Sequence, residues 1–413
     1  MTPSAPGRIS ELRLRRIFDS RGNPTVEAEI WTDRGERARA GAPSGASRGV
    51  HEVRAFPEGG VEVALERFRA RVKDQFVGQV LGDQTAFDTA LREADGSPDL
   101  STLGGNTTTA LSLAYALVTA RAQGLPLWRS LAGGTHDPPV FPALAGNVLN
   151  GGVHAMGGPD IQEFIVLAEA PEISWAVEGM VAVHREVGRR LRERFPQAAL
   201  GQGDEGGWVS PLGNLETLEL LVSACQTIQD RGLRAGLSLR PGLDLAASEF
   251  FREGRYVYRE QTLDREGQIG FVQELTDRFG LVFVEDPLDQ EDFEGFAQLT
   301  AQVGRGGRTW VVGDDLYTTD PGRVARGMEM ASTNAVLLKV NQVGTLTETR
   351  RVVERAEAAG AWTVCSHRSG ETPDPWLAHL PLAFGSRGLK TGVLGGERMA
   401  KLNELVRLRS RES

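Results

Sequence analysis

The second half of the chain contains four short apolar runs that each stop at an acid or a lysine. The runs PGLDLAAS, LVFVEDP, WVVGDD and AVLLKVNQ present Asp244, Glu285, Asp314 and Lys339. The steps between these residues are 41, 29 and 25 positions, each long enough for a helix and a return strand. Such spacing is typical of a (β/α) barrel, in which catalytic side chains follow successive strands at one end. The pattern predicts a barrel enzyme whose acids and lysine meet in one site.

The bulk composition excludes several classes of protein. With 413 residues, the chain is long enough for a barrel and an attached domain. A formal net charge of -9 argues against a broad nucleic-acid surface, which is normally basic. No run of about 18 apolar residues predicts a membrane span, and the first residues lack the apolar core of a signal peptide. The two cysteines, Cys225 and Cys365, imply no disulfide framework, so we expect a cytoplasmic protein.

The first third of the chain has a different pattern of apolar and polar residues from the rest. Residues 8–33 alternate as strands do, the segment GAPSGASRGVHE is predicted to be a mobile loop, and residues 61–124 follow a helical period. Strands followed by helices without alternation predict an α+β domain. We place this domain at 1–136 and the barrel at 137–413, where βα units alternate.

The three strand-end carboxylates predict a magnesium site. Mg²⁺ prefers hard oxygen ligands, and Asp244, Glu285 and Asp314 supply them from three strands. Taken singly, an acid after a strand is most often a helix N-cap or a solvated turn residue. The barrel-like spacing of the three acids favours the metal site. We expect Asp286 and Asp315, which directly follow Glu285 and Asp314, to be supporting or capping groups.

Lys339 is predicted to be a general base. Its charge lies in an apolar run, and burial or neighbouring cations lower the pKa of a lysine towards neutrality. The alternative is a lysine that extends from the strand end into solvent. Lys390, in the segment LKTG, is expected either to lower the pKa of Lys339 or to hold a substrate carboxylate.

The segment GQGDEGGW contains a G-x-G-x-x-G pattern from Gly201 to Gly206. A dinucleotide site is rejected because Asp204 and Glu205 would face the pyrophosphate and Pro211 interrupts the following helix. We interpret the segment as a flexible loop that presents a general acid.

Two further segments predict contacts with a ligand. SHRSG places His367, Arg368 and Ser369 after a strand, and an arginine fork beside a hydroxyl is suited to phosphate. A structural salt bridge of Arg368 is the alternative. The glycine-rich LNGGVHAMGG surrounds His154 and is followed by Glu163, which suggests a loop that closes over a ligand.

Together these motifs resemble the enolase family. The resemblance rests on eleven segments in the family's order: DSRGNPTVE, PSGAS, NGGVHA, QEF, GDEGG, DLAASEF, VEDP, GDDL, LLKVNQVGT, SHRSGET and KTG. It implies an α/β fold in which an N-terminal α+β domain caps a (β/α)8 barrel whose second strand runs antiparallel. It also implies a homodimer or a higher homo-oligomer, and Glu27 and Arg407 match part of the family's dimer-edge charges.

The resemblance also implies a reaction and its metals. The chain would dehydrate 2-phosphoglycerate to phosphoenolpyruvate with two Mg²⁺ ions, the second arriving with substrate. Asp244, Glu285 and Asp314 would bind the first ion, and Ser47 would help to bind the second. Two Mg²⁺ ions and a lysine base are the enolase-superfamily arrangement that is used to stabilise an enolate.

The remaining roles follow by matching motif. Lys339 would remove the C2 proton, and Glu205 would protonate the departing C3 hydroxyl with help from Glu163. The residues that would bind substrate are His154, His367, Arg368, Ser369 and Lys390.

Departures from the family pattern leave two alternatives open. Gly395 and Gly396 stand where Arg and Ser are expected, and the segments around Asn106 and in VRAFPEGG also differ. One alternative is an enolase-like enzyme of phosphonate metabolism, acting on a phosphonate carboxylic acid to form a carboxyphosphonoenolpyruvate-type product. The other is a non-catalytic binding protein on the same scaffold.

Overall fold

An antiparallel sheet and a helical layer form the N-terminal part of the chain. The computed structural model describes residues 7–45, 49–80, 82–133, 139–155 and 157–412. Strands β1 (Ile9–Phe18), β2 (Pro24–Thr32) and β3 (Arg37–Gly41) pair in chain order. The helices that follow are α1 (Gly60–Phe68), the π-helical turn η1 (Arg69–Lys73), α2 (Asp74–Phe76), α3 (Gln84–Asp95), α4 (Gly105–Gln123) and α5 (Leu127–Ala132). The predicted order of strands and then helices is confirmed.

Strand β3 is the one N-terminal strand that the sequence pattern did not indicate. It is only five residues long and buries Ala38 and Ala40, which carry little apolar signal. Its last residue, Gly41, falls within the segment that was predicted to be a loop. Among the described residues of that segment, the chain is irregular apart from an isolated bridge between Ser44 and Gly370.

Eight strands close a barrel in the second part of the chain. They are β4 (Ala143–Asn150), β5 (Glu163–Glu169), β7 (Ser238–Asp244), β11 (Phe283–Glu285), β12 (Trp310–Gly313), β13 (Ala335–Leu338), β14 (Trp362–Ser366) and β15 (Gly388–Gly392). They pair in chain order, and β15 closes the barrel on β4. Strand β5 runs antiparallel to both β4 and β7, and the other pairings among the eight are parallel. The expected antiparallel second strand is confirmed.

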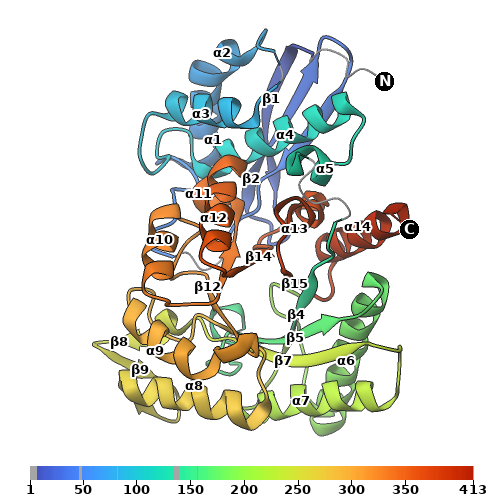
Figure 1. Ribbon diagram of the computed structural model, residues 1–413, viewed down its shortest axis with the longest axis vertical. Helices are drawn as coiled ribbons and strands as arrows, with labels where there is room; N and C mark the ends of the chain where they lie inside the picture. The colour runs from blue at the N-terminus through green and yellow to red at the C-terminus, as the bar shows by residue number, and fades with distance from the viewer. Residues whose placement is uncertain (1–6, 46–48, 81, 134–138, 156, 413) are drawn as a thin grey trace.

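Helices surround the barrel and join it to the N-terminal layers (Figure 1). They are α6 (Ile173–Arg194), α7 (Asn214–Asp230), α8 (Arg265–Phe279), α9 (Phe293–Val303), α10 (Pro321–Glu329), α11 (Val340–Val343), α12 (Leu346–Ala358), α13 (Leu380–Phe384) and α14 (Gly396–Glu412). Helix α4 contacts β2 and β3 on one side and α11 and α12 on the other. Because it lies between two layers, most of α4 is buried.

Three of the barrel helices begin at an aspartate cap. The side chains of Asp264, Asp292 and Asp320 accept hydrogen bonds from backbone N–H groups three residues later, at distances of 2.9, 2.9 and 2.7 Å. Such caps satisfy donors that the first helical turn leaves unpaired. These capping acids are not the predicted metal carboxylates, which lie at the strand ends instead.

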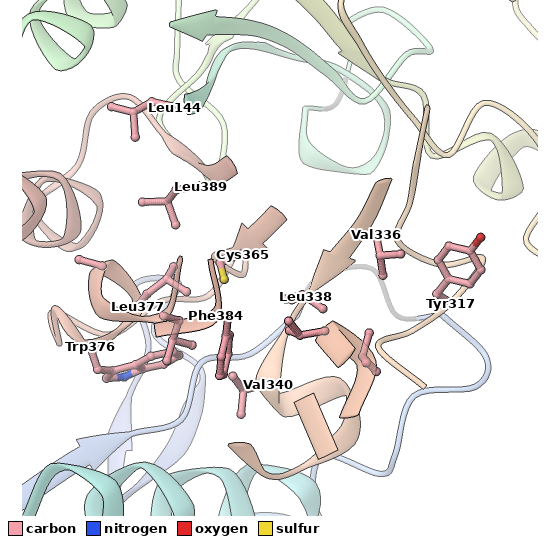
Figure 2. Close-up of a cluster of buried hydrophobic side chains, with 14 of the residues drawn as sticks. Leu144, Tyr317, Val336, Leu338, Val340, Cys365, Trp376, Leu377, Phe384 and Leu389 are labelled. Atoms are coloured by element: carbon pink, nitrogen blue, oxygen red, sulfur yellow. The ribbon is translucent and has the colours of Figure 1, made fainter. Parts of the chain in front are cut away.

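The barrel strands separate two apolar layers. Inward side chains such as Ile165, Phe283, Val312, Leu337 and Val364 fill the barrel. The alternate residues point outwards, and Figure 2 shows them against the surrounding elements: Cys365 and Leu389 lie on the side of Trp376, Leu377 and Phe384, and Val336 lies beside Tyr317. This alternation fixes the register of each strand and therefore the direction of the side chain at its end. No helix among the described residues is both long and apolar enough to cross a bilayer.

Candidate active site

The predicted polar side chains at one end of the barrel come from seven of its eight strands. Asp244 ends β7, Glu285 ends β11, and Asp314, Lys339 and His367 directly follow β12, β13 and β14. Lys390 lies within β15, and Glu163 begins the antiparallel β5 at this same end. All these residues except Lys339 are less than a tenth exposed, and the side chain of Lys339 is 13% exposed. The predicted convergence of the strand ends is therefore observed.

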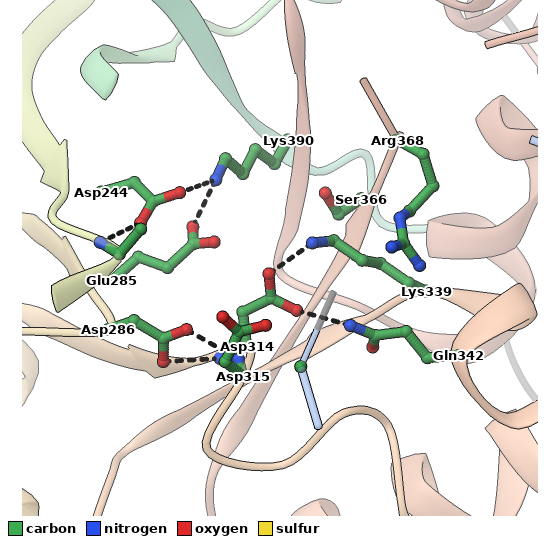
Figure 3. Close-up of polar contacts among 12 residues, drawn as sticks. Asp244, Glu285, Asp286, Asp314, Asp315, Lys339, Gln342, Ser366, Arg368 and Lys390 are labelled. Atoms are coloured by element: carbon green, nitrogen blue, oxygen red, sulfur yellow. Dashed lines mark hydrogen bonds and ion pairs between the residues drawn. The ribbon is translucent and has the colours of Figure 1, made fainter. Parts of the chain in front are cut away.

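Lys390 is surrounded by three of the carboxylates. Its Nζ donates to Asp244 Oδ2 at 2.9 Å and to Glu285 Oε2 at 2.7 Å, as Figure 3 shows. Glu163 Oε2 lies 3.2 Å from the same ammonium group. Burial lowers the pKa of Lys390, but the charges of these three carboxylates outweigh burial and raise that pKa well above its ordinary value.

Lys339 forms an ion pair with Asp314 through Nζ and Oδ2. Gln342 Nε2 donates to the other oxygen of Asp314 at 2.9 Å (Figure 3). Burial lowers the pKa of Lys339, but the Asp314 carboxylate reverses the effect, so that the pKa is raised. The expectation of a lowered lysine pKa is therefore wrong for this arrangement, because the sequence did not reveal the direct contact with Asp314.

Asp286 supports the turn that carries Asp314. Its Oδ1 accepts the backbone N–H of Asp314 at 3.0 Å, and its Oδ2 accepts that of Asp315 at 2.7 Å (Figure 3). Both of its oxygens are thus engaged, which agrees with the expected supporting role. Burial and the Asp314 carboxylate raise the pKa of the neighbouring Asp315 to about 8.

Two overlapping sets of carboxylates are candidates for holding a hard divalent cation. The predicted set of Asp244, Glu285 and Asp314 comes from adjacent strands, and Glu285 Oε1 is buried without a hydrogen-bond partner. A second set has oxygens within 4.8 Å of one another and consists of Asp286, Asp314 and Asp315. We favour the predicted set because the Asp286 oxygens already accept backbone N–H groups. Oxygen donors of this kind suit Mg²⁺.

A cluster of two histidines and two glutamates faces Lys339 across the barrel. His154 Nδ1 lies 3.6 Å from Glu163 Oε1 and 4.0 Å from Glu205 Oε1, and His367 Nε2 lies 3.1 Å from Glu205 Oε2. The last contact has hydrogen-bond distance, although its angle is outside the range of a good hydrogen bond. Asn147 of β4 donates to Glu205 Oε2 at 3.0 Å. The two histidines and the two glutamates were predicted for the site, whereas Asn147 was not.

The two glutamates have pKa shifts in opposite directions. Burial and the Glu205 charge raise the pKa of Glu163 well above its ordinary value. Burial also raises the pKa of Glu205, but the His367 and His154 rings outweigh burial and hold it well below its ordinary value. Burial lowers the pKa of His367 to about 4, so its ring is neutral at pH 7. The pair of acids can therefore hold one proton, and the proton resides preferentially on Glu163.

Arg368 is held by a carboxylate that the sequence did not indicate. Its Nη1 donates to Glu52 Oε2 at 3.1 Å and to Asn341 Oδ1 at 3.0 Å, and its Nη2 donates to Glu52 Oε1 at 3.1 Å. The salt-bridge alternative for Arg368 is therefore present in the structure. Glu52 was missed, although it is the last residue of the segment GAPSGASRGVHE that was predicted to be a mobile loop. Ser47, in that loop, lies outside the described residues.

A small cavity of about 20 Å³ lies among these side chains. It is lined by Gly45, His154, Gln162, Glu163, Glu205, Asp244, Lys339, Ser366, His367, Arg368, Ser369 and Lys390. A space of this size holds about one water molecule, so a larger ligand must displace side chains. A larger cavity of about 370 Å³ lies by Thr119, Arg350 and Phe384, but the predicted site residues do not line it.

One of the two glycines that depart from the family pattern, Gly395, has a backbone reason. Gly395 adopts φ of 110°, a region that non-glycine residues rarely occupy, and it directly precedes α14. A Cβ at this position would also lie 2.8 Å from Glu397 Oε1. The turn into α14 therefore favours glycine at position 395.

Comparison with known proteins gives consistent matches along the chain. Residues 9–131 match the family described as "Enolase, N-terminal domain", and residues 138–412 match "Enolase, C-terminal TIM barrel domain". The enolase of Thermoplasma acidophilum is 43% identical over 400 residues, covering 97% of this chain and 98% of that protein. The enolase of Methanothermobacter thermautotrophicus is 44% identical over 406 residues, covering 97% and 96%. The enolase of Natronomonas pharaonis is 43% identical over 402 residues, covering 97% and 98%.

Proposed function

The chain belongs to the enolase family, and from that premise we propose how its residues divide the dehydration of 2-phosphoglycerate to phosphoenolpyruvate. The reaction removes the C2 proton and expels the C3 hydroxyl as water, so it needs a base and an acid on different sides of the substrate. The chain is accordingly a lyase that acts on a small phosphorylated carboxylic acid.

One topological observation carries this assignment. Glu163 begins β5 and Lys339 follows β13, and these strands are four places apart in either direction around the barrel. A lysine and a glutamate pair therefore face each other across the axis at the same end. A three-carbon substrate between them would present C2 to one side and the C3 hydroxyl to the other.

Lys339 is the proposed base. Its pKa is raised while Asp314 accepts from Nζ, so the amine is protonated in this arrangement. To act as a base, Lys339 must lose its proton. This requires that its amine separate from Asp314 or that the charge of Asp314 be offset. A cation on the Asp314 oxygens would do so, and the same residue would then tune the lysine and hold the metal.

Glu205 is the proposed proton donor to the C3 hydroxyl, and Glu163 is its partner. The raised pKa of Glu163 lets the pair keep one proton at neutral pH, despite burial next to a second carboxylate. A positioned acid of this kind contributes about 10²- to 10⁴-fold to a rate. His154 lies between the two acids and His367 lies beside Glu205, so both rings can orient the proton.

Mg²⁺ is the metal of the family's chemistry, and Asp244, Glu285 and Asp314 are the residues proposed to hold it. When bound, it offsets the negative charge that the substrate carboxylate gains after proton removal. We propose two ions per site, the second bound with substrate and with the help of Ser47. Lys390 donates to Asp244 and Glu285 and is the proposed partner of the substrate carboxylate.

Arg368 and Ser369 are the proposed phosphate contacts. Arg368 is buried and bidentate to Glu52, so its guanidinium is already oriented by a carboxylate. A phosphate would have to share the guanidinium with Glu52 or replace it. A planar five-donor fork can serve both groups only if the phosphate approaches a different edge.

We propose a homodimer in the cytoplasm, with a domain limit near residue 136. Glu27 lies in β2 with Arg15 and Arg39 at 3.4 and 3.7 Å, and Arg407 is exposed on α14, where it pairs with Glu404 at 2.7 Å. A light-scattering mass of twice 44.7 kDa would support the dimer, and a mass of 44.7 kDa would contradict it.

The direct test mixes the protein, Mg²⁺ and 2-phosphoglycerate and follows the ultraviolet absorbance of the enolpyruvate product. Turnover that a chelator abolishes is the expected result. Glu205→Gln tests the division of roles, because it should lose dehydration while still exchanging the C2 proton with deuterium from solvent. Folded wild-type protein that binds Mg²⁺ but neither exchanges nor dehydrates would contradict the proposed function.

A further inference from the structure

Arg398 places a guanidinium directly behind the proposed acid. It is the third residue of α14, and its side chain is completely buried. Nη1 donates to the carbonyl oxygen of Arg368 and Nη2 to that of Ser369, each at 2.6 Å. Nη2 also lies 3.3 Å from the carbonyl oxygen of Asp204. One side chain thus joins the phosphate segment to the loop that carries Glu205.

The same guanidinium determines which nitrogen of His367 bears the proton. Arg398 Nη1 lies 2.8 Å from His367 Nδ1, and the backbone N–H of Gly392 donates to that nitrogen at 3.3 Å. A guanidinium and a backbone N–H can only donate, so Nδ1 must accept and cannot carry a hydrogen. The neutral ring therefore carries its proton on Nε2, which lies 3.1 Å from Glu205 Oε2.

We propose that Arg398 is a positioning residue that fixes the His367 tautomer and the Glu205 loop, so that Nε2, which lies 3.1 Å from the Glu205 carboxylate, is the His367 nitrogen that carries the hydrogen. The proposal deepens the proposed function, because it rests on Glu205 acting as the proton donor. With the other tautomer, a lone pair of Nε2 would face the carboxylate oxygen, and the two would repel.

The backbone on either side of Glu205 is held as well. The carbonyl of Asp204 contacts Arg398, and the carbonyl of Gly206 lies 2.8 Å from Nε2 of the buried His184. A Cβ on Gly392 would approach the Glu205 carbonyl oxygen to 2.1 Å, so β15 packs directly on this loop. Fixed neighbours of this kind keep a catalytic group within the narrow range of useful geometries. Arg398 is the member that connects this support to His367.

Lys401 provides a matched control on the same helix. It is also completely buried, donates to the Thr372 carbonyl at 2.6 Å and pairs with Glu371 at 2.8 Å. None of its described contacts involves His367 or the Glu205 loop. Lys401→Met therefore removes a buried cation without removing the donor to Nδ1.

The first test observes the tautomer without requiring activity. Protein labelled with ¹⁵N only at histidine Nδ1 gives one signal from each of six histidines, and the His367→Asn variant identifies the signal of His367. We expect an unprotonated Nδ1 in the wild type and in Lys401→Met, and a protonated or mixed Nδ1 in Arg398→Met. Arg398→Lys, which keeps a cationic donor, should restore part of the unprotonated signal. A protonated Nδ1 in the wild type would overturn the proposal, even if Arg398→Met failed to fold.

The second test separates the two halves of the reaction. In D₂O, Arg398→Met should keep C2 proton exchange of 2-phosphoglycerate within about threefold of the wild type but lose roughly 100-fold in dehydration, the lower range for loss of a positioned acid. Lys401→Met should change the two rates by the same factor. Equal loss of exchange and dehydration in Arg398→Met would overturn the positioning role. A wild type with neither rate would instead refute the proposed function, and the tautomer test would still decide the role of Arg398.

Discussion

Glu163 and Asp244 lie directly opposite each other, although one begins its strand and the other ends it. They are register partners because β5 and β7 are antiparallel. Both contact the Lys390 ammonium, at 3.2 and 2.9 Å. Because β5 runs antiparallel to its neighbours, its first residue, Glu163, lies at the end of the barrel where the other site strands finish.

Glu163→Gln should separate activity from stability. The substitution keeps the shape of the side chain but removes the acid that shares a proton with Glu205. We expect kcat to fall by about 100-fold or more, while the urea midpoint stays equal or rises, because burial already disfavours the charged form of Glu163. Steady-state absorbance assays and urea unfolding at pH 7 measure the two effects. A kcat within threefold of the wild type would remove Glu163 from the proposed mechanism.

The sequence was sufficient for groups whose positions follow from the backbone alone. Asp244, Glu285, Asp314 and Lys339 could be predicted together because parallel strand ends meet at one edge of a barrel. Strand β3 escaped notice because its alternating alanines carry a weak signal.

Contacts between distant side chains could not be predicted in the same way. Glu52 and Arg368 are 316 residues apart in the chain, and no local pattern indicates that their side chains meet. The raised pKa of Lys339 likewise depends on the direction in which Asp314 points. No pattern in the sequence indicated a role for Arg398, because its contacts with His367 and the Glu205 loop depend on how α14 packs.

Lys339→Met should abolish both halves of the reaction. Without the amine, neither C2 exchange in D₂O nor dehydration should be detectable, unlike the result expected for Glu205→Gln. The variant also leaves the buried Asp314 without its cation. Removal of one partner from a buried ion pair costs about 3–5 kcal/mol. Urea unfolding in a chelator measures this cost, and a double variant with Asp314→Asn should lose less than the two single variants combined. Additive losses would show that the pair is not coupled.

Glu285→Gln and Asp315→Asn distinguish the two carboxylate sets. If Asp244, Glu285 and Asp314 hold Mg²⁺, Glu285→Gln should weaken Mg²⁺ binding by roughly 100-fold or more. Loss of a residue that only hydrogen-bonds to a metal ligand already lowers metal affinity by about 10- to 100-fold. Asp315→Asn should then have the smaller effect. Calorimetric titration and the rise of the melting temperature with Mg²⁺ concentration measure the affinity. The reverse order would assign the ion to Asp286, Asp314 and Asp315.

Asp88 should give the stability of the protein a pH dependence between about pH 4 and 6. It lies in α3 and accepts from Thr347 of α12 through the backbone N–H at 3.0 Å and the hydroxyl at 2.6 Å. Burial raises its pKa from 3.8 to about 6. The folded state therefore holds this proton after the unfolded state has lost it, so the contribution is fully present below about pH 4 and is lost as pH rises through 6. A shift of this size is worth about 3 kcal/mol.

Asp88→Asn isolates that contribution because asparagine does not titrate. The difference in unfolding free energy between the variant and the wild type should change across pH 4–6 and be constant above pH 7. Urea unfolding at several pH values provides the measurement. A difference that stays constant across the whole range would show that Asp88 has the same pKa in both states.

Gly392→Ala should damage the site through the backbone alone. The new Cβ would lie 2.1 Å from the Glu205 carbonyl oxygen, and a backbone atom cannot move aside as a flexible side chain can. We expect a loss of about 1–3 kcal/mol, typical of overpacking. Because the displaced group carries the proposed acid, dehydration should fall more than C2 exchange. The control is Gly270→Ala in the exposed middle of α8, where a Cβ meets nothing within 4 Å. That change should stabilise the protein by up to about 1 kcal/mol, because glycine is a poor helix former. Equal fractional losses of exchange and dehydration in Gly392→Ala would mean that the Glu205 loop absorbs the methyl group without moving its carboxylate.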